Sequence, residues 1–121
     1  MNSAKYIEQA TRTESPNFNM IDVRILHSAI GICTEAGELL DNVKKASFYN
    51  RPLGIWNLQE ELGDIFWYMA LLCSALGCTF EEIMDKNIKK LKERYPEQFT
   101  EINERNRNYE AEQNAAEKGK E

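Results

Sequence analysis

Residues 61–76 read ELGDIFWYMALLCSAL, a stretch in which nearly every position after Asp64 is apolar. The apolar positions do not alternate with a period of two, so the stretch predicts a helix that is apolar on almost every side. Such a helix is buried, either in the core of a domain or at a contact between subunits. The two acids near its start, Glu61 and Asp64, are then expected to face protein rather than water.

A second acidic pair, Glu35 and Glu38, lies in the other apolar stretch and has the same spacing of three residues. At this spacing both acids project from nearly the same side of a helix, one turn apart. If the two helices pack side by side, four carboxylates converge, and only a cation offsets their repulsion and desolvation. Oxygen ligands favour Mg²⁺, or Mn²⁺ as a substitute, over zinc. The alternative is that each pair lies on a solvated helix face.

The chain as a whole predicts an all-α fold, an antiparallel bundle of four to five helices. No segment alternates for long enough to indicate a strand. On the second helix, the apolar packing face is expected to consist of Ile25, Ala29, Ala36, Leu40 and Val43. The expected helices cover residues 3–13, about 20–45, 57–76 and about 79–95, and residues 47–56 form a loop.

Helix boundaries follow from capping signals. Asn57 with Glu60, and Thr79 with Glu82, resemble capping boxes at the starts of the third and fourth helices. Gly77 is expected to end the third helix. Glu60 is therefore expected to be a cap partner of Asn57 rather than a metal ligand.

Length and composition, 121 residues of which 42% are hydrophobic, fit one compact domain. Residues 1–18 are expected to form an N-terminal helix and turn, and residues 19–96 the main helical domain. Residues 97–121 are expected to form a polar C-terminal tail, which is frayed or, alternatively, forms a helix or oligomerisation arm that docks on a second subunit.

Charge and hydropathy limit the possible partners. The net charge of −5 disfavours polymeric nucleic acid, although it leaves room for a nucleotide held beside a cation. The longest apolar run, residues 65–80, is shorter than a membrane span, and no signal peptide is recognisable at the N-terminus. Three cysteines without a C-x-x-C motif are expected to be small core residues in a reducing cytoplasm. A cytoplasmic location without membrane contact is expected.

The sequence lacks the motifs of several common nucleotide-binding, hydrolase and di-iron sites. The chain has no G-x-x-x-x-G-K-[ST] loop, no G-x-G-x-x-G, no G-x-S-x-G and no E-x-x-H pair for a di-iron site. Hydrolysis at phosphorus by carboxylate-bound metal ions needs none of these.

Three segments carry a family resemblance: HSAIGICTEAGELLD at residues 27–41, EELGD at residues 60–64 and NIKKLKERYP at residues 87–96. With the Lys44-Lys45 pair and the loop FYNRP at residues 48–52, they closely resemble the MazG-like, all-α nucleoside triphosphate pyrophosphohydrolases over about residues 27–99. The resemblance implies Mg²⁺-dependent cleavage of a nucleoside triphosphate between the α and β phosphates. The products would be a nucleoside monophosphate and pyrophosphate, in nucleotide-pool house-cleaning or in phage or bacterial nucleotide metabolism.

The resemblance also implies site residues. Glu35, Glu38, Glu61 and Asp64 would be the catalytic metal ligands. Substrate contacts would come from six further residues: Lys44, Lys45, Tyr68, Asn87, Lys90 and Arg94.

Some of these positions have a structural alternative. Tyr68 can equally be an amphipathic core residue. Lys90 and Arg94 lie near a helix C-terminus, where cations are favourable without any substrate. His27 is more often a structural histidine than a catalytic base.

A bundle this short with so apolar a third helix predicts a homo-oligomer, a dimer or a dimer of dimers. The competing functional hypothesis is a regulatory module that binds nucleotide or metal without turnover. The four acids disfavour that hypothesis, because a purely structural bundle would be more stable with apolar residues there.

Overall fold

The computed structural model describes residues 1–118, and their regular secondary structure is entirely helical, as expected. The chain forms two compact units, Met1–Cys78 and Thr79–Glu121. The tail contains two short helices, whereas the sequence predicted either a frayed tail or a single docking helix or arm. In order, the helices are α1 (Ser3–Thr11), α2 (Ile21–Phe48), α3 (Ile55–Leu76), α4 (Phe80–Arg94), α5 (Glu101–Arg105) and α6 (Tyr109–Glu117).

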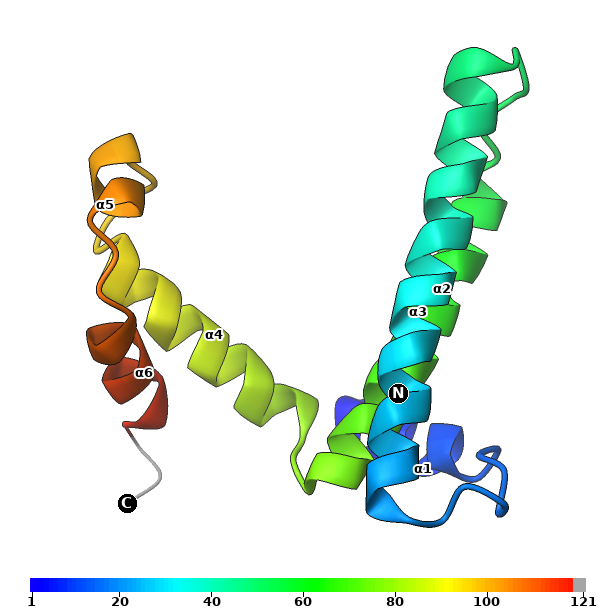
Figure 1. Cartoon of the computed structure of the whole chain (residues 1–121), viewed down its shortest axis with the longest axis horizontal. Coiled ribbons are helices and arrows are strands. Elements are labelled where there is room, and N and C mark those ends of the chain that lie inside the picture. Colours follow the sequence, from blue (N-terminus) through cyan, green and yellow to red (C-terminus); the bar gives the residue numbers. More distant parts are fainter. Residues whose placement is uncertain (119–121) are drawn as a thin grey trace. The chain divides into compact units, whose positions relative to one another are not determined.

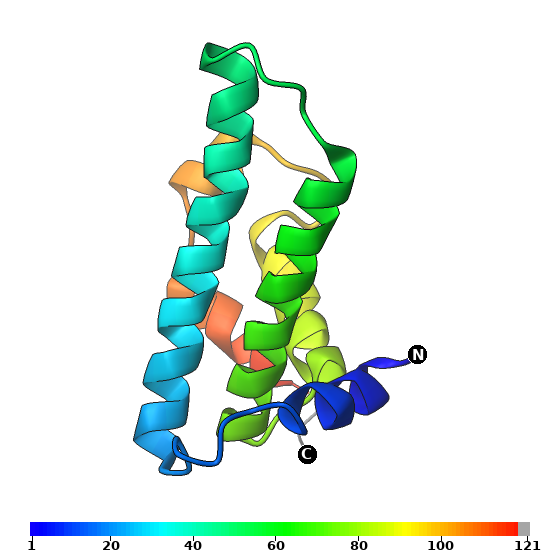
Figure 2. The ribbon, with the colours of Figure 1, turned by 90° about the vertical axis from the view of Figure 1, so that its right-hand side faces the viewer.

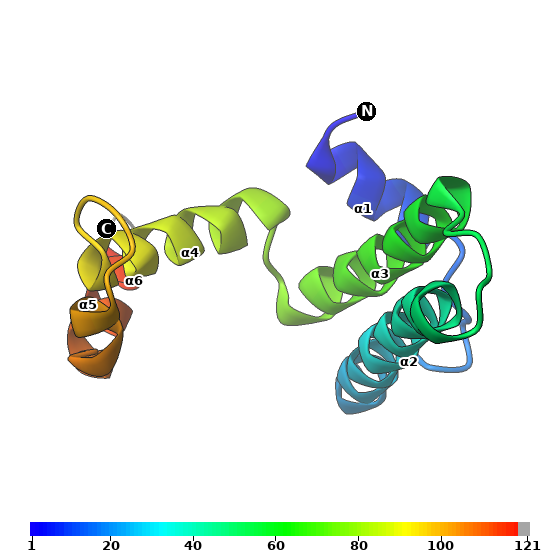
Figure 3. The same ribbon diagram turned by 90° about the horizontal axis from the view of Figure 1, so that it is seen from above.

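The first unit is built on α2 and α3, which lie side by side and antiparallel (Figures 1 and 2). Viewed from above, α3 lies between α1 and α2 (Figure 3). The turn after α1 is fixed to α3, since the Trp67 indole Nε1 donates to Thr13 Oγ1 at 2.8 Å. Arg24 of α2 joins the turn after α1 to α3. Its guanidinium pairs with Glu14 of that turn at 3.0 Å and donates to Ser74 Oγ of α3 at 2.9 Å.

Burial is concentrated in the C-terminal half of α3, where Ala70, Leu71, Cys73 and Ala75 are buried. Before this buried segment, Leu62 and Phe66 stay exposed, so the expected all-round burial holds for only part of this helix. Among residues 1–118 no single helix has the length and hydropathy of a membrane span, although α3 and α4 together pass as a broken segment by length and composition alone.

The side of α2 that packs on α3 differs from the expected one. Ser28 and Gly31 are buried there, and Glu35 is partly buried, whereas Ala29, Ala36, Leu40 and Val43 are exposed. Small residues form the packing face of α2, because the ring of Tyr68 on α3 lies directly against Gly31 and leaves no room for a side chain there. Several large apolar side chains of both helices are nevertheless exposed in the single chain. We call the following residues the apolar face: Leu26, Ile30 and Leu40 of α2, with Leu62 and Phe66 of α3.

The capping predictions had mixed outcomes. Gly77 ends α3 in the left-handed conformation, with φ of 70°, as expected. The Thr79 hydroxyl accepts from the Glu82 amide and starts α4, also as expected. The prediction that Asn57 caps α3 was wrong, because the helix begins two residues earlier, with Gly54 as its N-cap and no side-chain cap. Asn57 therefore lies inside the first turn.

The cysteine prediction was only partly correct. Cys73 is buried and Cys78 partly buried, but Cys33 is exposed on α2, and all three are free thiols.

In the second unit α6 packs on α4, so the tail is not frayed as far as Glu117. The anchor is Glu112, which is 2% exposed and binds Arg94 Nε at 2.5 Å and Arg107 at 3.2 Å. Burial disfavours the ionised Glu112, but hydrogen bonds from both arginines hold its pKa below the ordinary range. No periodic pattern in the sequence predicts the ion pair between Arg94 and Glu112, since the two residues are 18 positions apart. An oligomerisation arm in residues 97–121 stays a prediction.

Candidate active site

Three of the four predicted ligands meet between α2 and α3. Carboxylate oxygens of Glu35, Glu38 and Glu61 all lie within 4.8 Å of one another. We call these residues the acidic cluster. They converge because α2 presents Glu35 and Glu38 one turn apart on the side that faces α3, and the antiparallel α3 brings Glu61 to the same level.

Two carboxyl groups of the acidic cluster resist ionisation, because their pKa values are raised. Burial raises the pKa of Glu35, and the charges of Glu38 and Asp64 add to this effect, although a hydrogen bond with Glu61 opposes it. A hydrogen bond with Glu35, together with burial and the nearby Glu38, raises the pKa of Glu61 to about 7. At neutral pH, Glu35 and Glu61 can therefore share a proton.

The cluster fits a hard divalent cation. Buried Oε2 atoms of Glu35 and Glu61 have no hydrogen-bond partner among the described residues. A cation would supply the missing partner and offset the charge of Glu38, which adds to the rise of both pKa values. The donors are all carboxylate oxygens, which is the ligand set of Mg²⁺ and Mn²⁺ rather than of zinc.

The shared proton has a consequence for stability. Glu61 has an ordinary pKa of 4.5 when unfolded and about 7 when folded, so the metal-free fold favours the protonated form. The stability that it contributes is complete below the unfolded value and is lost as pH rises through about 7. We expect the melting temperature in chelator to fall between about pH 5.5 and 8, and Mg²⁺ to restore it at pH 8. Thermal melts of the wild type and of Glu61→Gln over this pH range measure the effect. An equal dependence of melting temperature on pH in both proteins would contradict the prediction.

The fourth predicted ligand, Asp64, lies outside the group of three but close to it. Asp64 is exposed, one turn further along α3 than Glu61, and its charge contributes to the raised pKa of Glu35. It also raises the pKa of Tyr6 on α1, for which burial is the larger cause. Tyr6 was not identified from the sequence, because it lies outside the segments that resemble the family. Metal ligation by Asp64 stays a prediction.

Tyr68 is held tightly against α2. A Cβ at Gly31 would lie 2.1 Å from its ring, and the rings of His27 and Trp67 flank it with centroids 5.6 and 4.9 Å away. This packing supports the structural alternative for Tyr68, and a substrate contact stays a prediction. His27 also packs on Phe18 at 5.0 Å, while its buried Nδ1 has no hydrogen-bond partner among the described residues.

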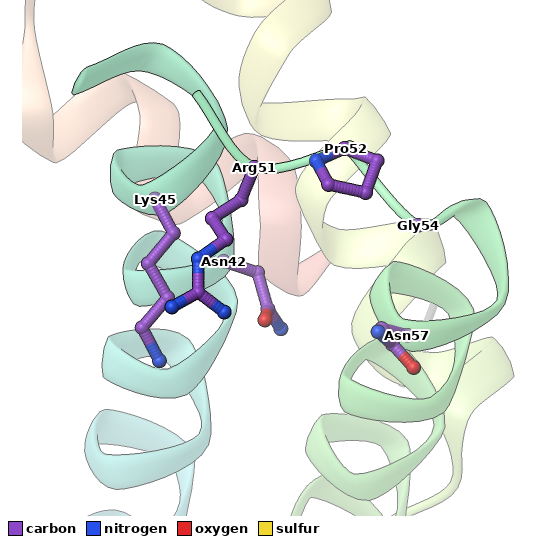
Figure 4. Close-up of a pocket in the computed structure, with 6 residues that line it drawn as sticks. All are labelled: Asn42, Lys45, Arg51, Pro52, Gly54 and Asn57. Carbon is purple, nitrogen blue, oxygen red and sulfur yellow. The ribbon is translucent and has the colours of Figure 1, made fainter. Parts of the chain in front are cut away.

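The paired lysines at the end of α2 both bind Asp41. The distances are 3.3 Å for Lys44 and 2.8 Å for Lys45, and both hydrogen bonds lower the pKa of Asp41. Lys45 additionally lines a pocket at the α2–α3 connection (Figure 4). The aromatic side chains of this connection, Phe48, Tyr49 and Trp56, are exposed, as is Glu60.

The remaining predicted contacts, Asn87, Lys90 and Arg94, lie on α4 in the second unit. Asn87 is exposed and Lys90 is partly buried. The Arg94 guanidinium binds Glu112 and lies 3.8 Å from Glu104, so its charge is already paired within the unit. A role in substrate binding stays a prediction for all three residues.

The segment that contains the acidic cluster matches a known protein family. The model of the MazG nucleotide pyrophosphohydrolase domain matches residues 27–99, which include the acidic cluster. The chain belongs to the MazG family. It is also 34% identical over 73 residues to the Gene 37 protein of Mycobacterium phage L5, a match covering 54% of this chain and 60% of that protein. The chain thus spans less than two thirds of this phage relative. No solved structure matched the chain.

Proposed function

We propose that this MazG protein is a Mg²⁺-dependent pyrophosphohydrolase that converts a nucleoside triphosphate to the monophosphate and pyrophosphate. The observation that carries the proposal is the convergence of Glu35, Glu38 and Glu61 within 4.8 Å inside the MazG-matched segment. A cluster kept only for structure would be more stable with apolar residues, because two of its carboxylates have raised pKa values.

Each carboxylate has a distinct part in this proposal. Glu35 and Glu61 are partly buried and hold the cation from opposite helices, while the exposed Glu38 is open to water and phosphate. Bound Mg²⁺ would neutralise phosphate charge and lower the pKa of a coordinated water. Asp64 completes the acidic set from the next turn of α3. Lys44 and Lys45 at the end of α2 would supply donors to the substrate.

The bond that is cleaved tests the reaction class. We expect phosphorus NMR of a triphosphate incubated with the protein and Mg²⁺ to show monophosphate and pyrophosphate in equal amounts. Diphosphate with orthophosphate would reject α–β cleavage. Binding of triphosphate without any product, across a panel of ribo- and deoxyribonucleotides, would favour the non-catalytic module instead.

The proposed assembly is a homo-oligomer, a dimer or a dimer of dimers, that covers the apolar face. Its side chains are strongly exposed in the single chain, for example 67% for Leu40 and 60% for Leu26. They recur at helical spacing along each helix, and a second copy is proposed to cover them. A face of this kind is uncommon on a protein that stays monomeric.

We therefore expect sedimentation velocity to show an oligomer for the wild type, and Ile30→Glu to shift it toward monomer. Burying an unpaired carboxylate in an apolar contact is strongly unfavourable, so the shift should be large. The matched control is Ile102→Glu on α5, which is also exposed but lies outside the apolar face. A monomeric wild type at micromolar concentration would refute the proposed assembly.

A further inference from the structure

A pocket of about 280 Å³ lies between the end of α2 and the start of α3 (Figure 4). Four of its side chains are polar, and they come from both helices and from the connection. The family resemblance implied a substrate contact for Lys45 alone among them, although Arg51 and Pro52 belong to the FYNRP segment of that resemblance. The lining residues are Asn42, Lys45, Arg51, Pro52, Gly54 and Asn57.

The pocket carries excess positive charge in a chain whose net charge is −5. Arg51 folds back along α2, so that its guanidinium lies beside Lys45 and Asn42 (Figure 4). Lys45 is paired with Asp41 at 2.8 Å, but no ion pair joins Arg51 to a carboxylate within residues 1–118. The start of α3 adds positive electrostatic potential to the pocket. Its first-turn amides are not capped by a side chain, because the N-cap residue is Gly54.

The helical register places the pocket one turn beyond the acidic cluster. Asn42 lies four residues after Glu38 on α2, and Asn57 lies four residues before Glu61 on α3. Residues four apart share a helix face and are separated by about 6 Å along the axis. Both asparagines therefore stand one turn beyond the carboxylates, in the direction of the connection.

We propose that this pocket binds the terminal phosphate of the nucleoside triphosphate, with Arg51 as its principal ligand. The inference rests on the proposed function, because it assumes a substrate whose α and β phosphates lie at the acidic cluster. A guanidinium can donate two parallel hydrogen bonds to a phosphate, and the amides of Asn42 and Asn57 can donate from opposite walls. The triphosphate thus runs from the acidic cluster toward the α2–α3 connection, and the leaving pyrophosphate is held at that end.

The test compares ligands that differ by one phosphate. Calorimetry with Mg²⁺ measures the binding of non-hydrolysable α,β-methylene triphosphate and diphosphate analogues of one nucleoside. We expect Arg51→Ala to weaken the triphosphate analogue about tenfold or more, as for loss of a charge-assisted hydrogen bond, and to leave the diphosphate analogue nearly unchanged. Arg51→Lys should give an intermediate loss of affinity, since lysine keeps the positive charge but cannot donate two parallel hydrogen bonds.

The control is Arg12→Ala, an exposed arginine at the end of α1 that lies outside the pocket and the acidic cluster. It should change neither affinity. Equal losses for both analogues in Arg51→Ala, no loss for either, or a wild type that binds neither analogue would overturn the proposal. Inorganic phosphate that binds beside the triphosphate analogue and is lost in Arg51→Ala would also overturn it, because the pocket would then take a separate anion.

The two proposals fail separately. A wild type without turnover that still shows the Arg51 effect on analogue binding would reject the hydrolase and keep the pocket. Normal turnover with unchanged affinity in Arg51→Ala would reject the pocket and keep the hydrolase.

Discussion

Glu61→Gln is expected to lower the turnover of the preferred triphosphate at least about 100-fold at saturating Mg²⁺. The substitution preserves the size of the side chain but removes one charged ligand from the acidic cluster, in which oxygens of Glu35, Glu38 and Glu61 lie within 4.8 Å. Titration with Mn²⁺ should show weakened metal binding in parallel. In chelator at pH 8 the variant should melt no lower than the wild type, because a neutral amide replaces a carboxylate whose ionisation is disfavoured by its hydrogen bond with Glu35 and by burial, which raise its pKa to about 7.

The chain offers a matched control in Glu60→Gln. Glu60 is the preceding residue, carries the same charge and is exposed outside the acidic cluster. It should retain nearly full activity and metal affinity. Wild-type turnover in Glu61→Gln would remove Glu61 from the metal site, and a large loss of stability in chelator would show that this carboxylate is structural.

The acidic cluster could be predicted from the sequence because its information is local. Two pairs at a spacing of three in apolar surroundings determine which sides of two helices carry carboxylates, and antiparallel neighbours can then bring them together. The family resemblance supplied the reaction but added no geometry. The raised pKa of Glu61 depends on its distance from Glu35, which the sequence does not contain.

The packing face of α2 could not be predicted, because hydrophobic periodicity does not tell which of two partners an apolar side chain meets. Leu40 and Val43 were assigned to the core, but they are exposed in the single chain. The contact with α3 is determined instead by Gly31 and Tyr68, where a missing side chain makes room for a ring. A single glycine in a helix gives no periodic signal, so only the structure reveals its importance.

The second helix of the tail was missed for a related reason. Residues 109–117 contain few apolar side chains, and α6 is held by a buried carboxylate between two arginines. A polar composition indicates disorder only when the polar groups lack buried partners.

Gly31→Ala is expected to destabilise the first unit by about 1–3 kcal/mol, since overpacking displaces side chains from a close-packed contact. The added Cβ would lie 2.1 Å from the ring of Tyr68, which cannot swing aside freely because His27 and Trp67 flank it. The expected fall in melting temperature is about 4–8 °C for each kcal/mol in a domain of this size. Denaturant or thermal unfolding measures the loss.

Gly37→Ala is the matched control on the same helix, because nothing lies within 4 Å of its added Cβ. There the substitution should stabilise the protein by about 0.5–1 kcal/mol, since alanine is the better helix former. Combining Gly31→Ala with Tyr68→Ala should cost less than the sum of the two single changes, because the ring that the new methyl group displaces is gone. Additive losses would mean that the two residues do not contact each other in solution, and the close approach of α2 to α3 would then need another cause.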